Sequence, residues 1–209
     1  MQEVKTRKGA ETKEKLLDVA EAAVLEKGFA ATSIDELIAT AGLTKSGFFY
    51  HFRDKNSLAK SLLQRYLERE EDLLNDLFNR ADELHEDPLH GFLIGLKMFA
   101  EMMSDLPAMH PGCLVASYCY QDRLFDDEVR ELNANGVLRW RRRFRERLDL
   151  IAQRYPPKID VDLDGMADMV SALVDGGIIL SKVVREKEIL PTQVLLYRSF
   201  VQAVFIGTK

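Results

Sequence analysis

Between Ser33 and Phe52 the chain reads SIDELIATAGLTKSGFFYHF, the pattern of two short helices joined by a tight turn. Ser33 and Glu36, three residues apart, form a capping box and predict a helix start, and Gly42 predicts its end. Thr44 predicts a second cap, followed by a helix from Lys45 to about His51. Two short helices around such a turn form a helix-turn-helix.

In a helix-turn-helix the first helix crosses the phosphate backbone of DNA and the second enters the major groove. A helix of seven residues is about 10 Å long and lies within a groove about 12 Å wide. Lys45 and Ser46 are expected to meet base edges or phosphates, and the Tyr50 hydroxyl to meet phosphate. Lys55 and the backbone amides after Asp54 are expected to form a phosphate clamp. The predicted DNA contacts are Ser33, Thr44, Lys45, Ser46, Gly47, Phe49, Tyr50, His51 and Lys55.

Outward from this segment, nearly every stretch has helical spacing of its apolar residues. One predicted helix ends at Gly28, and a long one begins after Asp54. Four more are predicted to run from Pro88 to about Leu106, from Asp126 or Asp127 to Arg154, from Leu163 to Arg185, and from Pro191 to Phe205. No run of alternating residues predicts a strand. The sequence therefore predicts an all-α fold, with a DNA-binding head at residues 10–56 and a larger body at residues 57–209.

Composition sets the class of protein. The chain has 209 residues, 46% hydrophobic and 30% charged, which is typical of a soluble protein with a core. No run of about 18 apolar residues predicts a membrane-spanning helix. Two cysteines and no apolar leader favour a reduced, cytoplasmic protein. A net charge of −5 argues against nucleic-acid binding over the whole surface, but Ala41–Lys60 carries four basic residues and one acidic residue and is suited to local phosphate binding.

The amino-terminal part contains a set of motifs that read Gly28-Phe29, Thr32-Ser33-Ile34, Ala41-Gly42-Leu43-Thr44-Lys45, and Phe49-Tyr50-His51-Phe52 with Asp54-Lys55 and Leu58. This set resembles the TetR family of bacterial transcriptional regulators. The resemblance is dense over about Thr12 to Leu63 and only architectural beyond. It implies an all-helical homodimer with a three-helix DNA-binding head, a small-molecule pocket in the body, and dimerisation through the last two helices.

Two positions depart from the family pattern. Ile38 stands where the family usually has a small residue, so the two helices are expected to pack slightly apart. Gly47 replaces a hydroxyl residue, and Phe49 stands where tyrosine is common. Two phosphate contacts are thus expected to be missing, with Tyr50 or His51 taking them over.

The resemblance also directs attention to two sets of body residues. An effector pocket is expected among apolar and methionine residues, which suit adaptable pockets: Phe92, Leu96, Phe99, Met103, Tyr118, Trp140, Phe144 and Met169. A dimer interface is expected in the last two helices, at Leu173, Gly176, Gly177, Val194, Tyr197, Phe200, Val201 and Val204. A glycine weakens a helix interior by about 1 kcal/mol, so the Gly176-Gly177 pair predicts a close approach of two helices.

The functional hypothesis is a homodimeric repressor that binds a palindromic operator and is released by a small apolar or aromatic effector. An activator of the same fold is the main alternative, because the sign depends on where the operator lies. A helical ligand-binding protein or an enzyme is a weaker one. The sequence has no nucleophile elbow, phosphate-cradling glycine loop or metal-ligand spacing, so no catalysis, cofactor or metal is expected.

Some remaining features have two interpretations. The arginine-rich run Arg139–Arg147 is expected to pair with acidic residues on an exposed helix face, with an anion site as the alternative. A basic arm before the first helix, which is either a DNA contact or a frayed terminus, contains Lys5, Arg7, Lys8 and Lys13. Cys113 and Cys119 are expected to be buried packing residues, with oxidant sensing as the alternative. The irregular spacing of His85, His90, His110 and Cys113 argues against a metal site.

Overall fold

The computed structural model describes residues 2–207, with side chains from Gly9 onward. Within residues 2–207 it has nine α-helices, one 3-10 helix and no strand, which confirms the predicted all-α fold. The elements are α1 (Gln2–Lys27), α2 (Ile34–Ala41), α3 (Lys45–His51), α4 (Lys55–Leu84), α5 (Pro88–Ser104), α6 (Leu114–Cys119), η1 (Asp122–Leu124), α7 (Asp127–Arg154), α8 (Leu163–Val184) and α9 (Ile189–Ile206).

Helix ends follow local signals closely in the amino-terminal part, and α2 and α3 have the predicted limits. The last helix begins at Ile189, two residues before Pro191, because proline is tolerated within a first helical turn. The first helix begins at Gln2, so the expected basic arm is part of α1 and does not precede it. The side chains of Lys5, Arg7 and Lys8 lie outside the described residues.

The chain divides into two compact units. The head unit comprises residues 1–68 and 111–135, and the body unit comprises residues 69–110 and 136–209. This division differs from the expected boundary after residue 56, because α4 residues Leu58, Leu62 and Leu67 are buried in the same core as α1 to α3. Residues 111–135 join that core through Tyr118 and Phe125.

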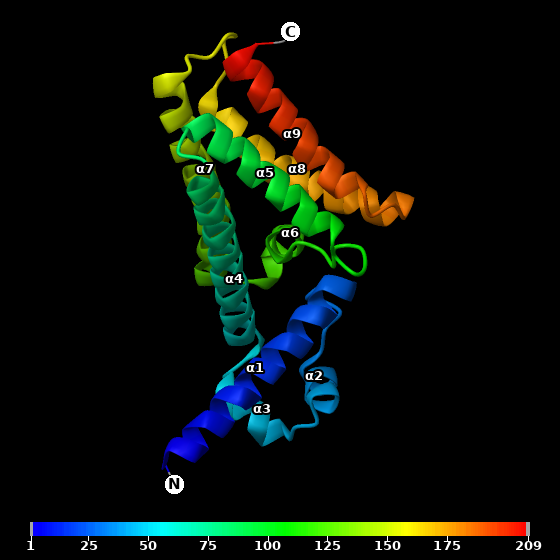
Figure 1. Cartoon of the computed structure of the whole chain (residues 1–209). Helices are drawn as coiled ribbons and strands as arrows, with labels where there is room; N and C mark the ends of the chain where they lie inside the picture. The colour runs from blue at the N-terminus through cyan, green and yellow to red at the C-terminus, as the bar shows by residue number, and fades with distance from the viewer. Residues whose placement is uncertain (1, 208–209) are drawn as a thin grey trace. The chain divides into compact units, whose positions relative to one another are not determined.

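In the head unit, α2 and α3 follow α1 and cover its apolar face (Figure 1). An aromatic cluster fixes residues 111–135 to them: the rings of Tyr118 and Phe125 stack at 4.3 Å between centroids, and Phe125 lies 4.7 Å from Phe29. The Tyr118 hydroxyl donates to the Ala59 carbonyl at 3.0 Å, and burial raises the pKa of this phenol. The Gln121 side-chain oxygen accepts the Ala30 N–H at 2.8 Å.

An ion-pair cluster joins α1 to α4 within the same unit. The Arg65 guanidinium is buried and lies 2.8–3.0 Å from carboxylate oxygens of Glu14, Asp18 and Glu21 on α1. Burial disfavours the charge on Arg65, but the bonds to Glu14 and Glu21 outweigh it and raise the pKa of the guanidinium. Because arginine presents a rigid fork of donors, one side chain holds three carboxylates in fixed positions.

In the body unit, α9 packs against α5 and α8 (Figure 1). By length and composition, α9 is the one helix within residues 2–207 apolar enough to cross a membrane. It is tied into the core by polar bonds: Tyr197 donates to the Met166 carbonyl on α8 at 2.9 Å, and Arg198 donates to the Leu93 carbonyl on α5 at 2.9 Å. The apolar side chains of α9 are therefore explained by its packing in the core of the body unit.

The arginine run on α7 pairs with acidic residues as expected, but its face is mostly half-buried, and of its six arginines only Arg142 is exposed. Arg141 makes two bonds to Asp168, at 2.7 and 2.6 Å, and Arg147 makes two to Asp82, at 3.0 and 2.9 Å. Arg145 pairs with both Asp149 and Asp164, and Arg139 pairs with Glu71. These ion pairs neutralise the positive charge that an anion-binding site would need.

Candidate nucleic-acid interface

The turn between α2 and α3 is built from short-range bonds. The Ser33 hydroxyl accepts the Glu36 N–H at 3.2 Å, while the Glu36 carboxylate pairs with Lys27. Gly42 has a φ of +64°, which favours glycine, and the next residue, Leu43, donates its N–H to the Ile38 carbonyl at 3.0 Å. These bonds fix the direction in which the chain enters α3.

The two faces of α3 have opposite environments. Phe48 and Phe52 are buried in the head core and anchor the helix. On the other face, the side chain of Phe49 is 45% exposed and that of Tyr50 is 81% exposed. Lys45 is exposed as well, with its ammonium 4.0 Å from the Asp35 carboxylate of α2. The helix thus presents Lys45, Ser46, Phe49 and Tyr50 to solvent.

Three predicted contacts at the start of α3, Thr44, Ser46 and Gly47, interact with one another at its N-cap, where Thr44 is the capping residue. The Thr44 hydroxyl accepts the Gly47 N–H at 3.1 Å and lies 3.0 Å from the Ser46 hydroxyl. A Cβ at Gly47 would lie 3.3 Å from the Thr44 hydroxyl oxygen, so glycine leaves this cap undisturbed. Ser33, in the same way, caps α2. For Ser33 and Thr44, capping is the role that the structure gives.

The side chains of His51 and Lys55 are partly buried against the head core, which leaves them less free to contact phosphate. Burial, together with the charge of nearby Lys13, lowers the pKa of His51 and so disfavours the charged ring that would attract phosphate. The Lys55 ammonium donates to the Phe29 carbonyl at 2.6 Å and lies 4.3 Å from the centre of the Phe29 ring. Burial lowers the pKa of Lys55. The structure therefore gives Lys55 an internal role in holding the loop after α1.

The predicted phosphate clamp at the start of α4 is already occupied by a carboxylate. Asp54 accepts the Ser57 N–H at 2.8 Å, and the Ser57 hydroxyl lies 3.1 Å from the Asp54 nitrogen. The bond from the Ser57 backbone, together with Arg53, lowers the pKa of Asp54. A negative charge at this helix end disfavours a bound phosphate.

Arg53 is a basic residue at this surface that the sequence reasoning missed. Its side chain is 89% exposed and pairs with the neighbouring Asp54, at 3.0 Å. The sequence could have indicated it, because a basic residue just after the second helix of the turn motif lies at the end of the helix that is expected to contact DNA.

The residues expected to form an effector pocket do not all come together. Phe92, Leu96, Phe99 and Phe144 are buried in the body core, and Met103, Trp140 and Met169 pack against it. Tyr118 is a correction: it lies in the core of the head unit, because its ring stacks on Phe125 and its hydroxyl is bonded to Ala59.

The expectation that both cysteines are buried is also wrong, since Cys119 is exposed and Cys113 is only half-buried.

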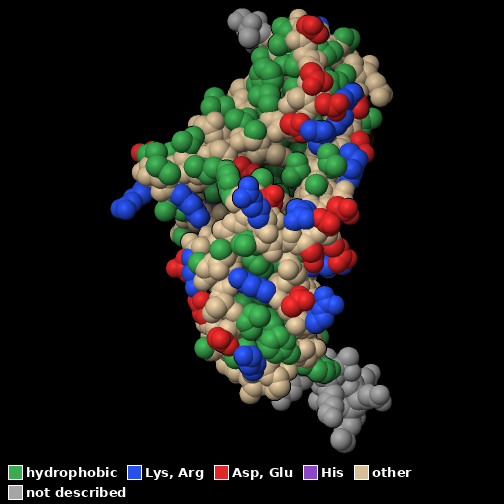
Figure 2. All heavy atoms as spheres, turned by 180° about the vertical axis from the view of Figure 1, so that it is seen from behind, with side chains coloured by type: hydrophobic (Ala, Val, Ile, Leu, Met, Phe, Trp, Pro, Cys, Tyr) green, Lys and Arg blue, Asp and Glu red, His purple; other side chains and the backbone are tan. Residues whose placement is uncertain are grey.

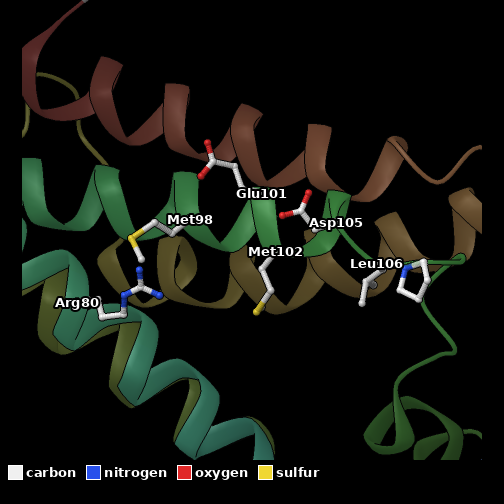
Figure 3. A pocket seen from close by; sticks show the side chains of 7 residues that line it. Arg80, Met98, Glu101, Met102, Asp105 and Leu106 are labelled. Atoms are coloured by element: carbon white, nitrogen blue, oxygen red, sulfur yellow. The ribbon is translucent and has the colours of Figure 1, made fainter.

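A hollow of about 410 Å³ lies elsewhere in the body unit, beside α5 (Figure 3). Met98, Met102 and Leu106 line it, with Arg80 reaching in from α4. The carboxylates of Glu101 and Asp105 and the ring of Pro107 complete the lining. None of the eight predicted pocket residues is among these seven.

Five of the eight residues of the predicted dimer surface are buried within a single chain. Val194, Tyr197, Val201 and Val204 belong to the body core and are unavailable to a partner. Gly177 is a further correction: a Cβ there would lie 3.1 Å from the Leu190 Cα atom, so its close approach is between α8 and α9 of one chain. At Gly176 a Cβ would meet nothing within 4 Å.

A different set of apolar side chains is exposed on these two helices, and Figure 2 shows hydrophobic side chains gathering over this part of the body unit. Large exposed members are Ile179, Leu180, Val183, Val184, Leu195, Leu196 and Ile206. Sequence periodicity does not single them out, because both helices are apolar on most of their circumference.

Three comparisons with known proteins bear on this geometry. The sequence pattern of the bacterial regulatory proteins of the tetR family matches residues 16–62, which include all of α2 and α3. The HTH-type transcriptional repressor BepR of Brucella suis is 30% identical over 95 residues, an alignment that covers 44% of this chain and 44% of BepR. The probable HTH-type transcriptional regulator ArpR of Pseudomonas putida is 27% identical over 169 residues, covering 79% and 78% of the two chains.

Solved structures extend the likeness to the whole fold. A TetR-family regulator from Agrobacterium tumefaciens has a TM-score of 0.77 at 16% identity, covering 94% of this chain and 99% of that one. The reduced form of Escherichia coli NemR has a TM-score of 0.73 at 20% identity, covering 90% and 96%. The chain is thus similar to TetR-family regulators in sequence over residues 16–62 and in fold over nearly its whole length. The predicted resemblance is thereby confirmed, and the turn motif is the part that the family pattern matches.

Proposed function

We propose that this chain is a homodimeric transcriptional repressor of the TetR family that binds operator DNA through α3. The observation that carries the proposal is the exposed face of α3, held outward by the burial of Phe48 and Phe52 behind it. Lys45 and Tyr50 supply the ammonium and the phenolic hydroxyl for phosphate or base edges, and Ser46 lies beside them. Arg53, at the end of the helix, adds a second exposed cation.

The second part of the proposal is a dimer through the exposed apolar side chains of α8 and α9. Val183, 76% exposed, and Leu196, 56% exposed, represent a surface that is costly to leave in water. Gly176 lies on α8 with open space around its Cα, which allows a second copy to approach closely. Two copies related by a twofold axis would place their α3 helices about 34–36 Å apart, in successive major grooves of a palindromic site.

The third part is release by an effector. A ligand that binds one conformation of the body unit better than another shifts the dimer between DNA-competent and DNA-incompetent states. The Met98 and Met102 side chains in the hollow beside α5 offer an adaptable apolar lining for a small apolar or aromatic compound. The protein thus acts by binding, without catalysis, in the cytoplasm where its DNA lies.

An electrophoretic shift assay with the region upstream of the chain's own operon tests DNA binding. The wild-type protein is expected to retard this fragment at low salt, and the double variant Lys45→Ala/Tyr50→Ala to lose the retarded band. Lys97→Ala is the matched control, because Lys97 is an exposed lysine of the body unit. Unchanged binding by the double variant would contradict the role of α3.

Sedimentation analysis tests the dimer. Val183→Glu is expected to shift the protein from dimer to monomer, because a charge at a packed interface is costly. Leu84→Glu serves as the control, since Leu84 is 67% exposed and lies on α4, which is not part of the proposed interface. A monomeric wild type, or a dimer that Val183→Glu leaves intact, would rule out this surface.

A further inference from the structure

The exposed face of α3 carries aromatic side chains that do not contribute to packing α3 against the head core. Phe49 and Tyr50 are 45% and 81% exposed, whereas the helix is already anchored by Phe48 and Phe52. The Phe49 ring lies edge-on to Phe48, with centroids 5.3 Å apart, so its orientation is defined. Together the two neighbouring rings form a small exposed aromatic patch on a seven-residue helix, and such a patch is suited to contact with an apolar group of a partner.

The same face is poor in groups that read bases by paired hydrogen bonds. Residues 44–52 contain no Asn, Gln or Arg, which leaves Lys45 as the one side chain of this segment that is among the usual bidentate readers of adenine or guanine. The Thr44 and Ser46 hydroxyls lie 3.0 Å apart, and Thr44 also accepts the Gly47 N–H. Lys45 is a single point donor beside Asp35. Sequence readout by α3 therefore has to rely largely on apolar contact.

In the major groove, the only apolar group that distinguishes one base from the others is the C5 methyl of thymine. We propose that Phe49, flanked by the ring of Tyr50, reads thymine methyl groups, so that the operator has thymines at the base pairs facing the middle of α3. This inference rests on the proposed function, because it names the sequence feature that the same face recognises.

The size of the effect follows from the methyl group itself. Burying one methyl-sized apolar group contributes about 0.8 kcal/mol, which corresponds to about fourfold in affinity. Replacing one contacted thymine by uracil, which lacks only that methyl, is therefore expected to weaken binding about fourfold. A symmetric site, with two equivalent contacts, is expected to lose about sixteenfold when both are replaced.

The experiment uses the full-length protein and duplexes selected by it from a random-sequence library. Each thymine of the selected site is replaced in turn by uracil, and affinity is measured by fluorescence anisotropy at one salt concentration. At one or more positions we expect the fourfold loss for the wild type. Phe49→Ala is expected to bind thymine and uracil duplexes equally, and Phe49→Leu to retain part of the difference. Leu124→Ala, which truncates another side chain that is 45% exposed, is the control and is expected to keep the full loss.

The outcomes separate this inference from the proposed function. If the protein selects a site but binds its thymine and uracil forms equally, methyl readout is wrong and DNA binding stands. If the uracil effect persists in Phe49→Ala, the methyl is read by another residue and the assignment to Phe49 is overturned. If no sequence is enriched over the random library at low salt, the proposed function itself fails. The wild-type measurement needs no variant, so the inference is tested even if Phe49→Ala folds poorly.

Discussion

Replacing Arg65 by methionine should loosen α1 from α4 within the head unit. Methionine keeps an unbranched apolar stem but removes the guanidinium that binds three carboxylates of α1. Removing one partner of a buried ion pair costs about 3–5 kcal/mol. Here the side chains of Glu14 and Asp18 are 54% and 62% exposed and regain water, while their repulsion with Glu21 remains. We therefore expect a loss of about 2–3 kcal/mol in the free energy of opening α1.

Amide hydrogen exchange reports this loss locally. A change of about 2–3 kcal/mol corresponds to exchange about 30- to 150-fold faster for the α1 amides around residues 14–21. Arg142→Met is the control: Arg142 is exposed on α7, and its replacement is expected to change stability by less than about 0.5 kcal/mol. If Arg65→Met leaves exchange in α1 as slow as Arg142→Met does, the cluster contributes little and the reasoning fails.

Three further changes test the packing and the charges. Gly95→Ala places a Cβ 2.4 Å from the Phe78 ring, so we expect a loss of about 1–3 kcal/mol, measured by urea unfolding. Gly28→Ala combines a φ of +85° with a contact of 2.5 Å to the Gln121 amide nitrogen, and is expected to lower the melting temperature. Asp87→Asn removes a carboxylate whose pKa is held far below its usual range: burial alone would raise it, but bonds from His90 and Tyr155 and the charge of Arg154 outweigh burial. A carboxylate with a depressed pKa in the folded state stabilises the fold at pH values above the ordinary aspartate pKa, and this stabilisation is lost as the pH falls. The free energy of unfolding of Asp87→Asn should therefore be lower than that of the wild type at neutral pH, and the difference should become smaller below about pH 4.

Each of these changes has a matched control. Gly9→Ala adds a Cβ that meets nothing within 4 Å and should not destabilise the chain, so an equal loss at both glycines would contradict the close contact with Phe78. In the background Gln121→Ala, the contact at Gly28 disappears and only the backbone strain remains, so the double variant should lose less than the sum of the two single changes. Asp160→Asn alters an exposed aspartate, and a pH dependence equal to that of Asp87→Asn would show that burial and bonding at Asp87 are irrelevant.

The limits of α2 and α3 were predictable from the sequence because capping is local. Ser33, Gly42 and Thr44 form their bonds within a few residues of themselves. The composition of the head unit was not predictable in this way. Tyr118 and Gln121 reach Ala59 and Ala30 across 59 and 91 residues, and nothing in their own sequence neighbourhood indicates these partners.

The same contrast holds for the surface proposed to bind DNA. The exposed Lys45 and Tyr50 follow from helical periodicity, since Phe48 and Phe52 occupy the other face. The internal role of Lys55 depends on Phe29, 26 residues earlier, and periodicity carries no information about such a contact. On α8 and α9, side chains are apolar nearly all round, so the sequence could not separate the core from the surface that is available to a partner.

The two-part composition of the head unit bears on how an effector can act. Residues 111–135 belong to the unit that holds α3, and the chain enters them directly after residues 69–110 of the body unit. A change in the body is therefore covalently connected to the head core both through α4 and through residues 111–135. The effect on DNA binding is bounded by the effector's difference in affinity for the two states, commonly about 1–3 kcal/mol or 5- to 150-fold. Titration with an effector should accordingly reach a plateau of weaker but finite DNA affinity, whereas affinity that keeps falling in proportion to effector concentration would indicate direct competition for α3.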